Sequence, residues 1–318
     1  LIRGLTIGEQ GALSASDWDA LRTTGTAHLA SISGLHVTMM GSLLSGVVGG
    51  LWRCSPRLLR WWPAPVAAGV GGLLGATLYA WMAGGGLPAQ RTVWMLAVVV
   101  LLRLSGRRWP WLLTLLLAYL VVTALDPWAL MAPGFWLSFV AVGVLMWGGG
   151  DAWVAPGASR GAVIRHALRE LSRAQALATV GLAPLSMVFF QTFSVIGLMA
   201  NLWCIPLFTL LLTPLALLGL GIAPLWRVLE PVARWTLDGL TWAATWPWSV
   251  WQVPAVSTWA AALAVLSGAW MLAPVSWRWR LLAVPACLPL LWSTSASRQL
   301  VNGKTAAQNW TGTFTPGE

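Results

Sequence analysis

The chain has 318 residues, of which 58% are hydrophobic and 9% are charged, with 25 tryptophans and a mean hydropathy of +0.72. This composition excludes an ordinary soluble domain and indicates an integral membrane protein. The formal net charge of +10 comes from arginine clusters that flank apolar segments. Such clusters set membrane topology and attract anionic lipid, so the charge does not by itself indicate a nucleic-acid-binding surface.

Apolar stretches long enough to cross a bilayer as helices recur along the whole chain. We therefore predict an all-α, polytopic transmembrane helical bundle with about 8 to 10 membrane segments. The predicted spans are residues 28–51, 64–83, 89–104, 110–125, 132–147, 174–191, 195–222, 235–252, 258–273 and 280–294. Prolines make 195–222 either one broken helix or two short ones, and 235–252 is expected to lie partly in the interface.

Three regions are expected along the chain. Residues 1–27 form a short lead-in helix or loop, residues 28–294 form the transmembrane domain, and residues 295–318 form a polar tail or linker without fixed structure. Within the transmembrane domain, residues 160–174 place apolar side chains on one helical face and basic side chains on the other. This pattern predicts an amphipathic helix in the cytoplasmic interface.

Most basic residues fall in alternate connections between the predicted spans. They are Arg53, Arg57, Arg60, Arg103, Arg107, Arg108, Arg160, Arg165, Arg169, Arg173, Arg227, Arg234, Arg278 and Arg280. The positive-inside rule places these connections in the cytoplasm, where anionic lipid is their expected partner. Both ends of the chain are then expected on the outer side of the membrane.

Polar side chains inside the spans are few, and most lie in the predicted outer half. A charged side chain in hydrocarbon costs roughly 2.5–3.5 kcal/mol on insertion scales, so such groups usually face a bundle interior or a wet cavity. They are therefore the candidate functional residues. They are His28, Ser31, Ser33, His36, Gln90, Arg91, Asp126, Ser138, Gln175, Thr179, Gln191 and Asn201.

The segment "HLASISGLHV" contains two of the three histidines. His28 and His36 would lie ~12 Å apart along a straight helix, so we expect no shared metal ion and no cofactor. Capping or packing roles explain them at least as well as ligand roles. Gly34 permits a close helix approach or a local break. Ser33 and His36 have the spacing of a nucleophile and base, but no acid is evident to orient them, and we predict no catalytic residue.

Four ordered blocks of sequence resemble the competence domain of the ComEC/Rec2 family. They are "GEQGALSASDWDALRTTGTAHLASISGLHV" (8–37), "LPAQRTVWM" (87–95), "DPWALMAPGFWLSFVAVGVL" (126–145) and "QALATVGLAPLSMVFFQTFSVIGLMANLWCIPL" (175–207). Ala30 and Ser31 depart from the common Leu-Ala form, and Trp136 stands where many members have glutamine. After about residue 220 only the hydropathy agrees.

The resemblance implies a channel that carries single-stranded DNA across the bacterial inner membrane during natural transformation, with other competence-machinery proteins as partners. Full-length members usually add an outer OB-like domain and a metallo-β-lactamase-like nuclease domain. The zinc signature of the nuclease is absent from this sequence. We therefore expect this chain to be the non-enzymatic competence domain of a longer protein. Its oligomeric state is left open.

On this interpretation the polar residues line or border a DNA path. The candidates are His28, Ser33, Gly34, His36, Arg91, Asp126, Phe135, Ser138, Phe139, Gln175, Gln191 and Asn201. Arg91 is the strongest candidate for a phosphate contact, because its guanidinium presents a fork of donors. An ion pair with Asp126, or contact with the interface, is the alternative. The two phenylalanines offer stacking surface for bases or, more commonly, pack in the core.

Two other functions suit the same residues. A small-molecule or ion transporter would use isolated polar groups at a midplane site, although no internal repeat is evident. A membrane-embedded enzyme acting on a phosphate-bearing lipid would hold its substrate with Arg91, His28 and His36. Neighbouring OB-like and nuclease domains would favour DNA uptake over both alternatives.

Thiol labelling tests the predicted orientation. With the native cysteines replaced, Arg107→Cys should react with a membrane-impermeant maleimide only after the cell membrane is opened, since the 103–108 loop is predicted to be cytoplasmic. Arg22→Cys, on the predicted outer side, is the control and should react in intact spheroplasts. Labelling of Arg107→Cys in intact spheroplasts would show that the orientation is inverted.

Overall fold

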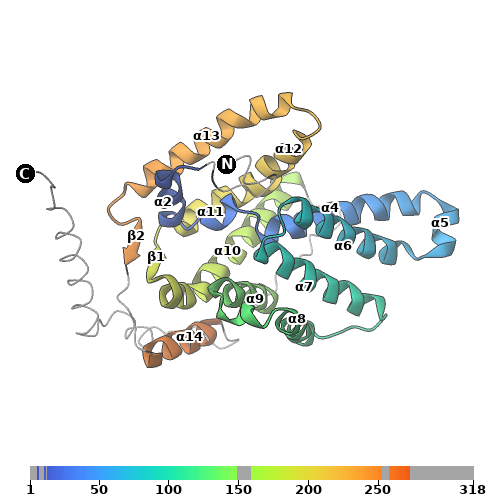
Figure 1. Ribbon diagram of the computed structural model, residues 1–318, viewed down its shortest axis with the longest axis horizontal. Helices are drawn as coiled ribbons and strands as arrows, with labels where there is room; N and C mark the ends of the chain where they lie inside the picture. The colour runs from blue at the N-terminus through green and yellow to red at the C-terminus, as the bar shows by residue number, and fades with distance from the viewer. Residues whose placement is uncertain (1–5, 7–10, 12, 149–158, 253–257, 273–318) are drawn as a thin grey trace, which may run out of the picture. The chain divides into compact units, whose positions relative to one another are not determined.

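The computed structural model describes residues 6, 11, 13–148, 159–252 and 258–272, and most of these residues are helical (Figure 1). The chain divides into two compact units. The first contains Leu1–Gln175 and Ser194–Val250, and the second contains Ala176–Phe193 and Trp251–Glu318. The candidate residues that the structure brings together all lie in the first unit.

The described residues form a series of helices and two short strands. In chain order they are α2 (Ala15–Thr23), α3 (Ala27–Ala30), α4 (Gly34–Arg53), α5 (Pro56–Trp61), α6 (Ala64–Met82), α7 (Leu87–Leu104), α8 (Trp111–Leu125), the 3-10 helix η1 (Pro127–Met131), α9 (Pro133–Trp147), α10 (Arg160–Phe190), β1 (Thr192–Ser194), α11 (Gly197–Pro206), the π-helix η2 (Leu207–Leu212), α12 (Thr213–Leu218), α13 (Pro224–Ala244), β2 (Val250–Gln252) and α14 (Thr258–Leu272). The strands β1 and β2 pair in a two-stranded sheet.

The first predicted span, residues 28–51, is not one continuous helix. Helix α3 ends at Ala30, the backbone of Ser31 and Ser33 is extended, and α4 begins at Gly34. Serine side chains compete with the helical backbone for hydrogen bonds, and Ser33 forms a capping box with His36 that starts α4. The prediction of an unbroken helix from residue 28 is therefore wrong, whereas the local break considered at Gly34 is confirmed.

Helices α4 and α6 pack through small residues along both partners. The atoms that a Cβ would meet if it were added to a glycine show where the two helices touch. The touching pairs are Gly41 with Ala76, Ser45 with Gly72, and Gly49 with Ala68. At Gly72 that carbon would lie 2.7 Å from the carbonyl oxygen of Gly41, so the two backbones meet directly. Small residues at every fourth position allow this close antiparallel approach in the same way as in other membrane helix pairs.

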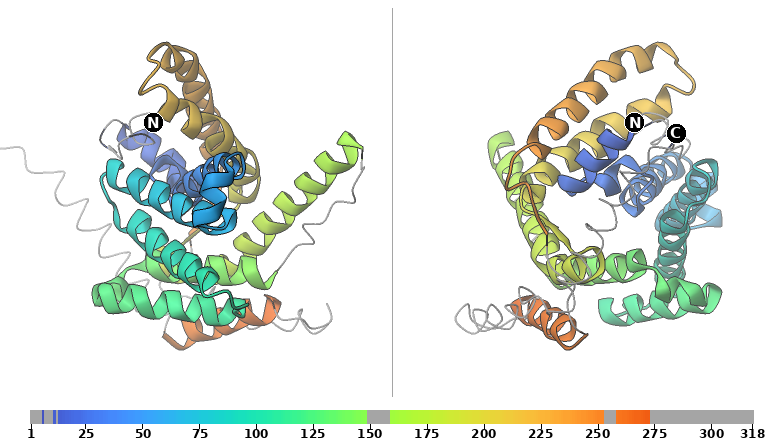
Figure 2. Two further views of the ribbon diagram at one scale, coloured as in Figure 1. Left: turned by 90° about the vertical axis from the view of Figure 1, so that its right-hand side faces the viewer. Right: turned by 60° about the vertical axis from the view of Figure 1, so that its left-hand side comes forward.

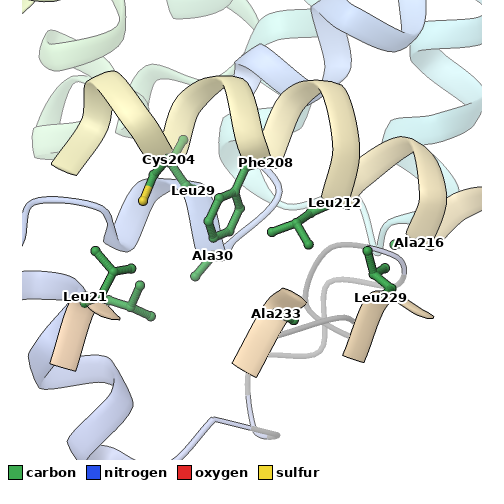
Figure 3. Packing of buried hydrophobic residues seen from close by; sticks show 10 residues of the cluster. Leu21, Leu29, Ala30, Cys204, Phe208, Leu212, Ala216, Leu229 and Ala233 are labelled. Atoms are coloured by element: carbon green, nitrogen blue, oxygen red, sulfur yellow. The ribbon is translucent and has the colours of Figure 1, made fainter. Parts of the chain in front are cut away.

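A cluster of buried hydrophobic residues joins the start of the chain to a segment far along the sequence. Leu21 and Leu29, from α2 and α3, pack with Phe208 and Leu212 of η2 and with Leu229 of α13. Figure 3 shows Leu29 and Ala30 next to Phe208, and the further views show α2 and α3 beside α11 (Figure 2). The amino-terminal segment is thus held against α11 and η2.

Two predicted boundaries differ from the structure. Residues 160–174 and the predicted span 174–191 form the single helix α10, which continues through Pro184. In place of 235–252, the structure has α13 ending at Ala244, followed by a turn and β2. In place of the one broken helix or two short ones predicted for 195–222, the structure has a continuous helical run, Gly197–Leu218, in which the six residues after Pro206 are π-helical.

Five of the described helical segments are long and apolar enough to cross a membrane: α4, α6, α7, α10 and Gly197–Leu218. Helices α8 and α9 are apolar but have only 15 residues each. The chain is therefore a helical membrane protein, but the predicted count of 8 to 10 segments is not confirmed. The predicted span 280–294 and the predicted tail 295–318 lie outside the described residues.

The close contact between α4 and α6 predicts a contrast between two glycines. Gly72→Ala should lower the free energy of unfolding by about 1–3 kcal/mol, because the new methyl group would meet the α4 backbone. Gly46→Ala is the control, since nothing lies within 4 Å of its added carbon, and it should be neutral or stabilising by up to about 1 kcal/mol. Thermal unfolding in detergent measures both; equal midpoints would contradict the packing described.

Candidate functional site

The turn between α2 and α3 is a buried polar structure. Gly25 has a left-handed φ of +67°. The hydroxyl of Thr24 donates to the carbonyl of Ala20 at 2.8 Å, and the hydroxyls of Thr24 and Thr26 lie 2.9 Å apart. Both threonines are fully buried. The polar groups of residues 23–26 are therefore largely satisfied within the turn itself, which makes it a fixed surface for its neighbours.

This turn docks against the start of α11. The Ser194 hydroxyl donates to the carbonyl of Thr23 at 2.6 Å, and Nδ2 of Asn201 donates to the carbonyl of Gly25 at 3.4 Å. A side-chain carbon on Gly25 would lie 3.3 Å from Cβ of Ser194, so the backbone itself forms the contact. Oδ1 of Asn201 is buried and has no hydrogen-bond partner among the described residues.

The break between α3 and α4 brings the two histidines into the same polar region. The imidazole of His28 is exposed and hydrogen-bonds to the backbone of Gly25. His36 is fully buried, and its ring is close enough to His28 for the two imidazoles to interact electrostatically. Its Nδ1 lies 3.3 Å from the backbone nitrogen of Ser33. The backbone of Ser31 also lies within hydrogen-bonding reach of the His36 ring. Nε2 of the ring, however, forms no hydrogen bond with any described residue.

The contact between Ser33 and His36 is a helix cap. The Ser33 hydroxyl lies 3.3 Å from Nδ1 of His36, and together they form the reciprocal capping box of α4. A nucleophilic serine also needs a group that orients its histidine, and no described carboxylate forms a hydrogen bond or ion pair with His36. Among the described residues, no group of three or more His, Cys, Asp or Glu side chains is arranged to hold a metal ion.

Arg91 lies in the first turns of α7 and is 9% exposed. Its Nε donates to the carbonyl of Leu87 at 3.3 Å. A side-chain carbon on Gly134, at the start of α9, would lie 3.2 Å from Nη2. Asp126 acts on Arg91 electrostatically, but the two form no ion pair within 4.0 Å. Within the described part of the chain, neither Nη1 nor Nη2 has a hydrogen-bond partner, so the guanidinium fork is available to an anion.

The histidine region and Arg91 are connected through the packing of α4 against α7. A side-chain carbon on Gly34 would lie 2.5 Å from Oγ1 of Thr92, the residue that follows Arg91. The first residue of α4 thus touches α7 in the turn that carries the guanidinium. We use the name polar cluster for His28, Ser33, His36 and Asn201 together with the turn at residues 23–26; Arg91 lies on the neighbouring helix α7. All of its members lie in the first unit.

The two phenylalanines among the candidates are core residues. Phe135 is fully buried and Phe139 is 7% exposed. The centroids of their rings lie 5.4 Å and 5.5 Å from that of Tyr119, in edge-to-face arrangements. Their rings are thus occupied with one another and with Tyr119, and the structure gives them a packing role. Ser138, on the same helix, is half-buried.

The remaining candidates lie at helix ends or apart from the polar cluster. Asp126 is half-buried and ends α8, where its backbone carbonyl accepts a hydrogen bond from Ala129 at 3.1 Å. Gln175 is buried within α10. Gln191 directly follows α10, has a φ of +57° and belongs to the second unit. These three residues are therefore not placed in the polar cluster, and their predicted lining role stays a prediction.

Several residues of the site are absent from the sequence-based candidates. Thr24, Gly25 and Thr26 form the docking turn, Ser194 binds it, and Thr92 contacts α4. A local signal existed for the turn, because a threonine and glycine run directly before the first histidine is typical turn chemistry. No local signal indicates that Ser194 is its partner.

The sequence matches the protein family described as "Competence protein" over residues 5–280. It is 38% identical over 248 residues to the competence protein ComA of Neisseria gonorrhoeae, covering 77% of this chain and 34% of that protein. It is 33% identical over 221 residues to the uncharacterized protein YcaI of Escherichia coli, covering 68% and 28%. Recombination protein 2 of Haemophilus influenzae is 28% identical over 227 residues, covering 68% and 28%.

The chain thus spans about a third or less of the length of these relatives. No solved structure resembles it significantly. The family match begins at residue 5, before α2, so it includes the polar turn and both histidines of the cluster.

The docking of the turn on α11 predicts a difference between two left-handed glycines. Gly106→Ala, at φ +69° with nothing within 4 Å, should cost roughly 1–2 kcal/mol of stability from the backbone alone. Gly25→Ala has nearly the same φ but also meets Ser194, so its unfolding temperature should fall further. The difference between the two unfolding midpoints in detergent isolates the docking contact. Equal midpoints would show that Gly25 does not approach Ser194 in the protein.

Proposed function

Because this chain belongs to the competence protein family, we propose that it forms an inner-membrane channel for single-stranded DNA that enters a bacterial cell during natural transformation. Two similar proteins carry the names competence protein and recombination protein, which supports a role in DNA uptake. Single-stranded DNA is then the cargo, and other proteins of the competence machinery are its partners.

Arg91 is the observation that carries the proposal. A buried cation among apolar helices is unfavourable unless a polar or anionic group meets it. Arg91 has one hydrogen bond to its own helix and no ion pair within 4.0 Å among the described residues. A phosphodiester oxygen fits this arrangement, because the guanidinium offers two terminal nitrogens in a plane and contact with the phosphate does not depend on the base.

Uncharged polar atoms extend the site beyond Arg91. Nε2 of His36 and Oδ1 of Asn201 are buried without hydrogen-bond partners in the described chain, and polar atoms of this kind usually bind water or a ligand. The backbone nitrogen of Ser33 donates to Nδ1 of His36, so in the neutral ring Nε2 carries the proton and can donate to a phosphate oxygen. Oδ1 of Asn201 only accepts, so it would bind water or an amino group of a base. Both groups are neutral and hold a strand more weakly than a second cation would. Transport requires sites from which the cargo can leave. We assign Ser33 and His36 a capping and lining role, without catalysis.

The arginine distribution supports an orientation with the polar cluster on the outer side. Helix α4 begins at the cluster and ends at Arg53, and α7 begins near Arg91 and reaches Arg103 in its last turn. If the arginine-rich connections lie in the cytoplasm and contact anionic lipid there, the cluster lies where DNA arrives. Both chain ends then lie on the outer side.

Substitution of Arg91 tests the proposal in a transformable strain whose own gene of this family is deleted. Arg91→Ala should lower uptake of labelled DNA about tenfold or more, because a charge-assisted hydrogen bond contributes roughly 1.5–3 kcal/mol and 1.4 kcal/mol corresponds to tenfold. Arg91→Lys keeps the charge without the fork and should fall between Arg91→Ala and the wild type.

Arg22→Ala is the matched control. Arg22 is an exposed arginine of α2 that pairs with Asp19 at 3.2 Å, and its loss should leave DNA uptake unchanged. Membrane insertion of every variant is checked by immunoblot of membrane fractions. Normal uptake by Arg91→Ala, at wild-type protein levels, would remove Arg91 from the DNA path.

A further inference from the structure

Helix α13 carries a continuous charged face that the proposed DNA path does not use. Its members are Arg227, Glu230, Arg234 and Asp238, and all are exposed. Glu230 and Arg234 form an ion pair at 2.6 Å one turn apart. The residues at a three- or four-residue spacing on another side of the helix are buried: Leu229, Ala233, Thr236 and Leu240. Helix α13 is therefore strongly amphipathic.

The buried side of α13 packs against α2 and runs antiparallel to α12, in the cluster that also contains Phe208 and Leu212 of η2 (Figure 1). At one end, Nε1 of Trp226 donates to the carbonyl of Ala216 at 3.0 Å. At the other end, the ring centroid of Trp235 lies 5.2 Å from that of Trp203. As α13 advances from Trp226 to Trp235, its partner runs backward from Ala216 to Trp203.

These two anchor points fix the depth of the charged face. Gly197–Leu218 has 22 residues and the highest mean hydropathy, 1.8, of the five candidate spans. Glu230 lies between the two tryptophan anchors and therefore beside the central part of this span. Facing lipid at that depth would cost roughly 2.5–3.5 kcal/mol for each charge. The Glu230–Arg234 pair is itself exposed, so pairing alone does not remove this cost.

We infer that the charged face of α13 borders water, and that it forms one wall of an aqueous cavity inside the membrane at the depth of the middle of Gly197–Leu218. The neighbouring span also holds polar atoms at this depth. The hydroxyls of Thr209 and Thr213 are buried without partners among the described residues, and both lie in or beside the π-helix η2. No contact joins them to the charged face, so the inference rests on the depth and the exposure of that face.

The charge sequence of this wall suits passage more than binding. Cations and anions alternate along it, from Arg227 to Glu230 to Arg234 to Asp238. Such a wall is hydrated but has no net charge with which to hold an anion or a cation, so a charged cargo can leave it. The inference rests on Gly197–Leu218 crossing the membrane and does not depend on DNA being the cargo.

Thiol accessibility tests the inference in the full chain, reconstituted in liposomes after replacement of Cys54, Cys204 and Cys287. Glu230→Cys is compared with Leu210→Cys, because Leu210 is an apolar residue of η2 at similar depth that is 75% exposed. The probe is a charged methanethiosulfonate reagent supplied on both sides of the bilayer. Glu230→Cys should react at least tenfold faster than Leu210→Cys, because the first borders water and the second faces lipid. Asp238→Cys is a second reporter on the charged face.

Every other pattern overturns the inference. Equal, fast reaction of Glu230→Cys and Leu210→Cys would show that this stretch lies outside the bilayer. Slow reaction of both Glu230→Cys and Asp238→Cys would show that protein or lipid covers the charged face. Since the assay contains no DNA, loss of uptake in Arg91→Ala and labelling of α13 succeed or fail separately.

Discussion

The close approach of α4 to α6 and α7 is the contact on which the polar cluster depends. Gly41 and Gly72 allow the backbones of α4 and α6 to touch, and Gly34 places the first turn of α4 against Thr92 of α7. Among apolar helices, tight packing of small residues replaces the hydrophobic effect as the source of association. Because α4 is held on both sides, its start is fixed, and the chain before it must turn at Ser31 and Ser33. That turn places His36 near the helix that carries Arg91.

The cost of placing polar groups among apolar helices links the two proposals. Arg91 is buried with its terminal nitrogens unpaired in the described structure, and the Glu230–Arg234 pair lies beside the middle of a candidate span. Neither arrangement is favourable against lipid. An anion beside Arg91 and water beside α13 would each remove this cost, at two separate places in the helical bundle.

The sequence predicts the elements of this fold better than their contacts. Hydropathy places α6, α7, α8 and α9 within a few residues of their bounds, because an apolar run of membrane length is a local signal, whereas it starts α4 too early. Gly34 and its serine neighbours also indicate the break before α4. By contrast, the hydrogen bond between Ser194 and Thr23 joins residues 171 positions apart, and no local period encodes it. The charges of α13 also led to a wrong boundary. The sequence predicts a partly interfacial span over 235–252, whereas the amphipathic helix α13 covers Pro224–Ala244.

A photo-crosslink between the protein and a DNA strand in transit tests the central claim most directly. Ser31 lies in the break between the two histidines, whereas Leu120, which is 61% exposed, belongs to the apolar helix α8, which contributes no residue to the polar cluster. With a photo-reactive amino acid at each position in turn, we expect labelled single-stranded DNA to crosslink at position 31 and not at position 120. Crosslinking at neither position, or at position 120 alone, in cells that take up DNA normally would contradict a path through the polar cluster.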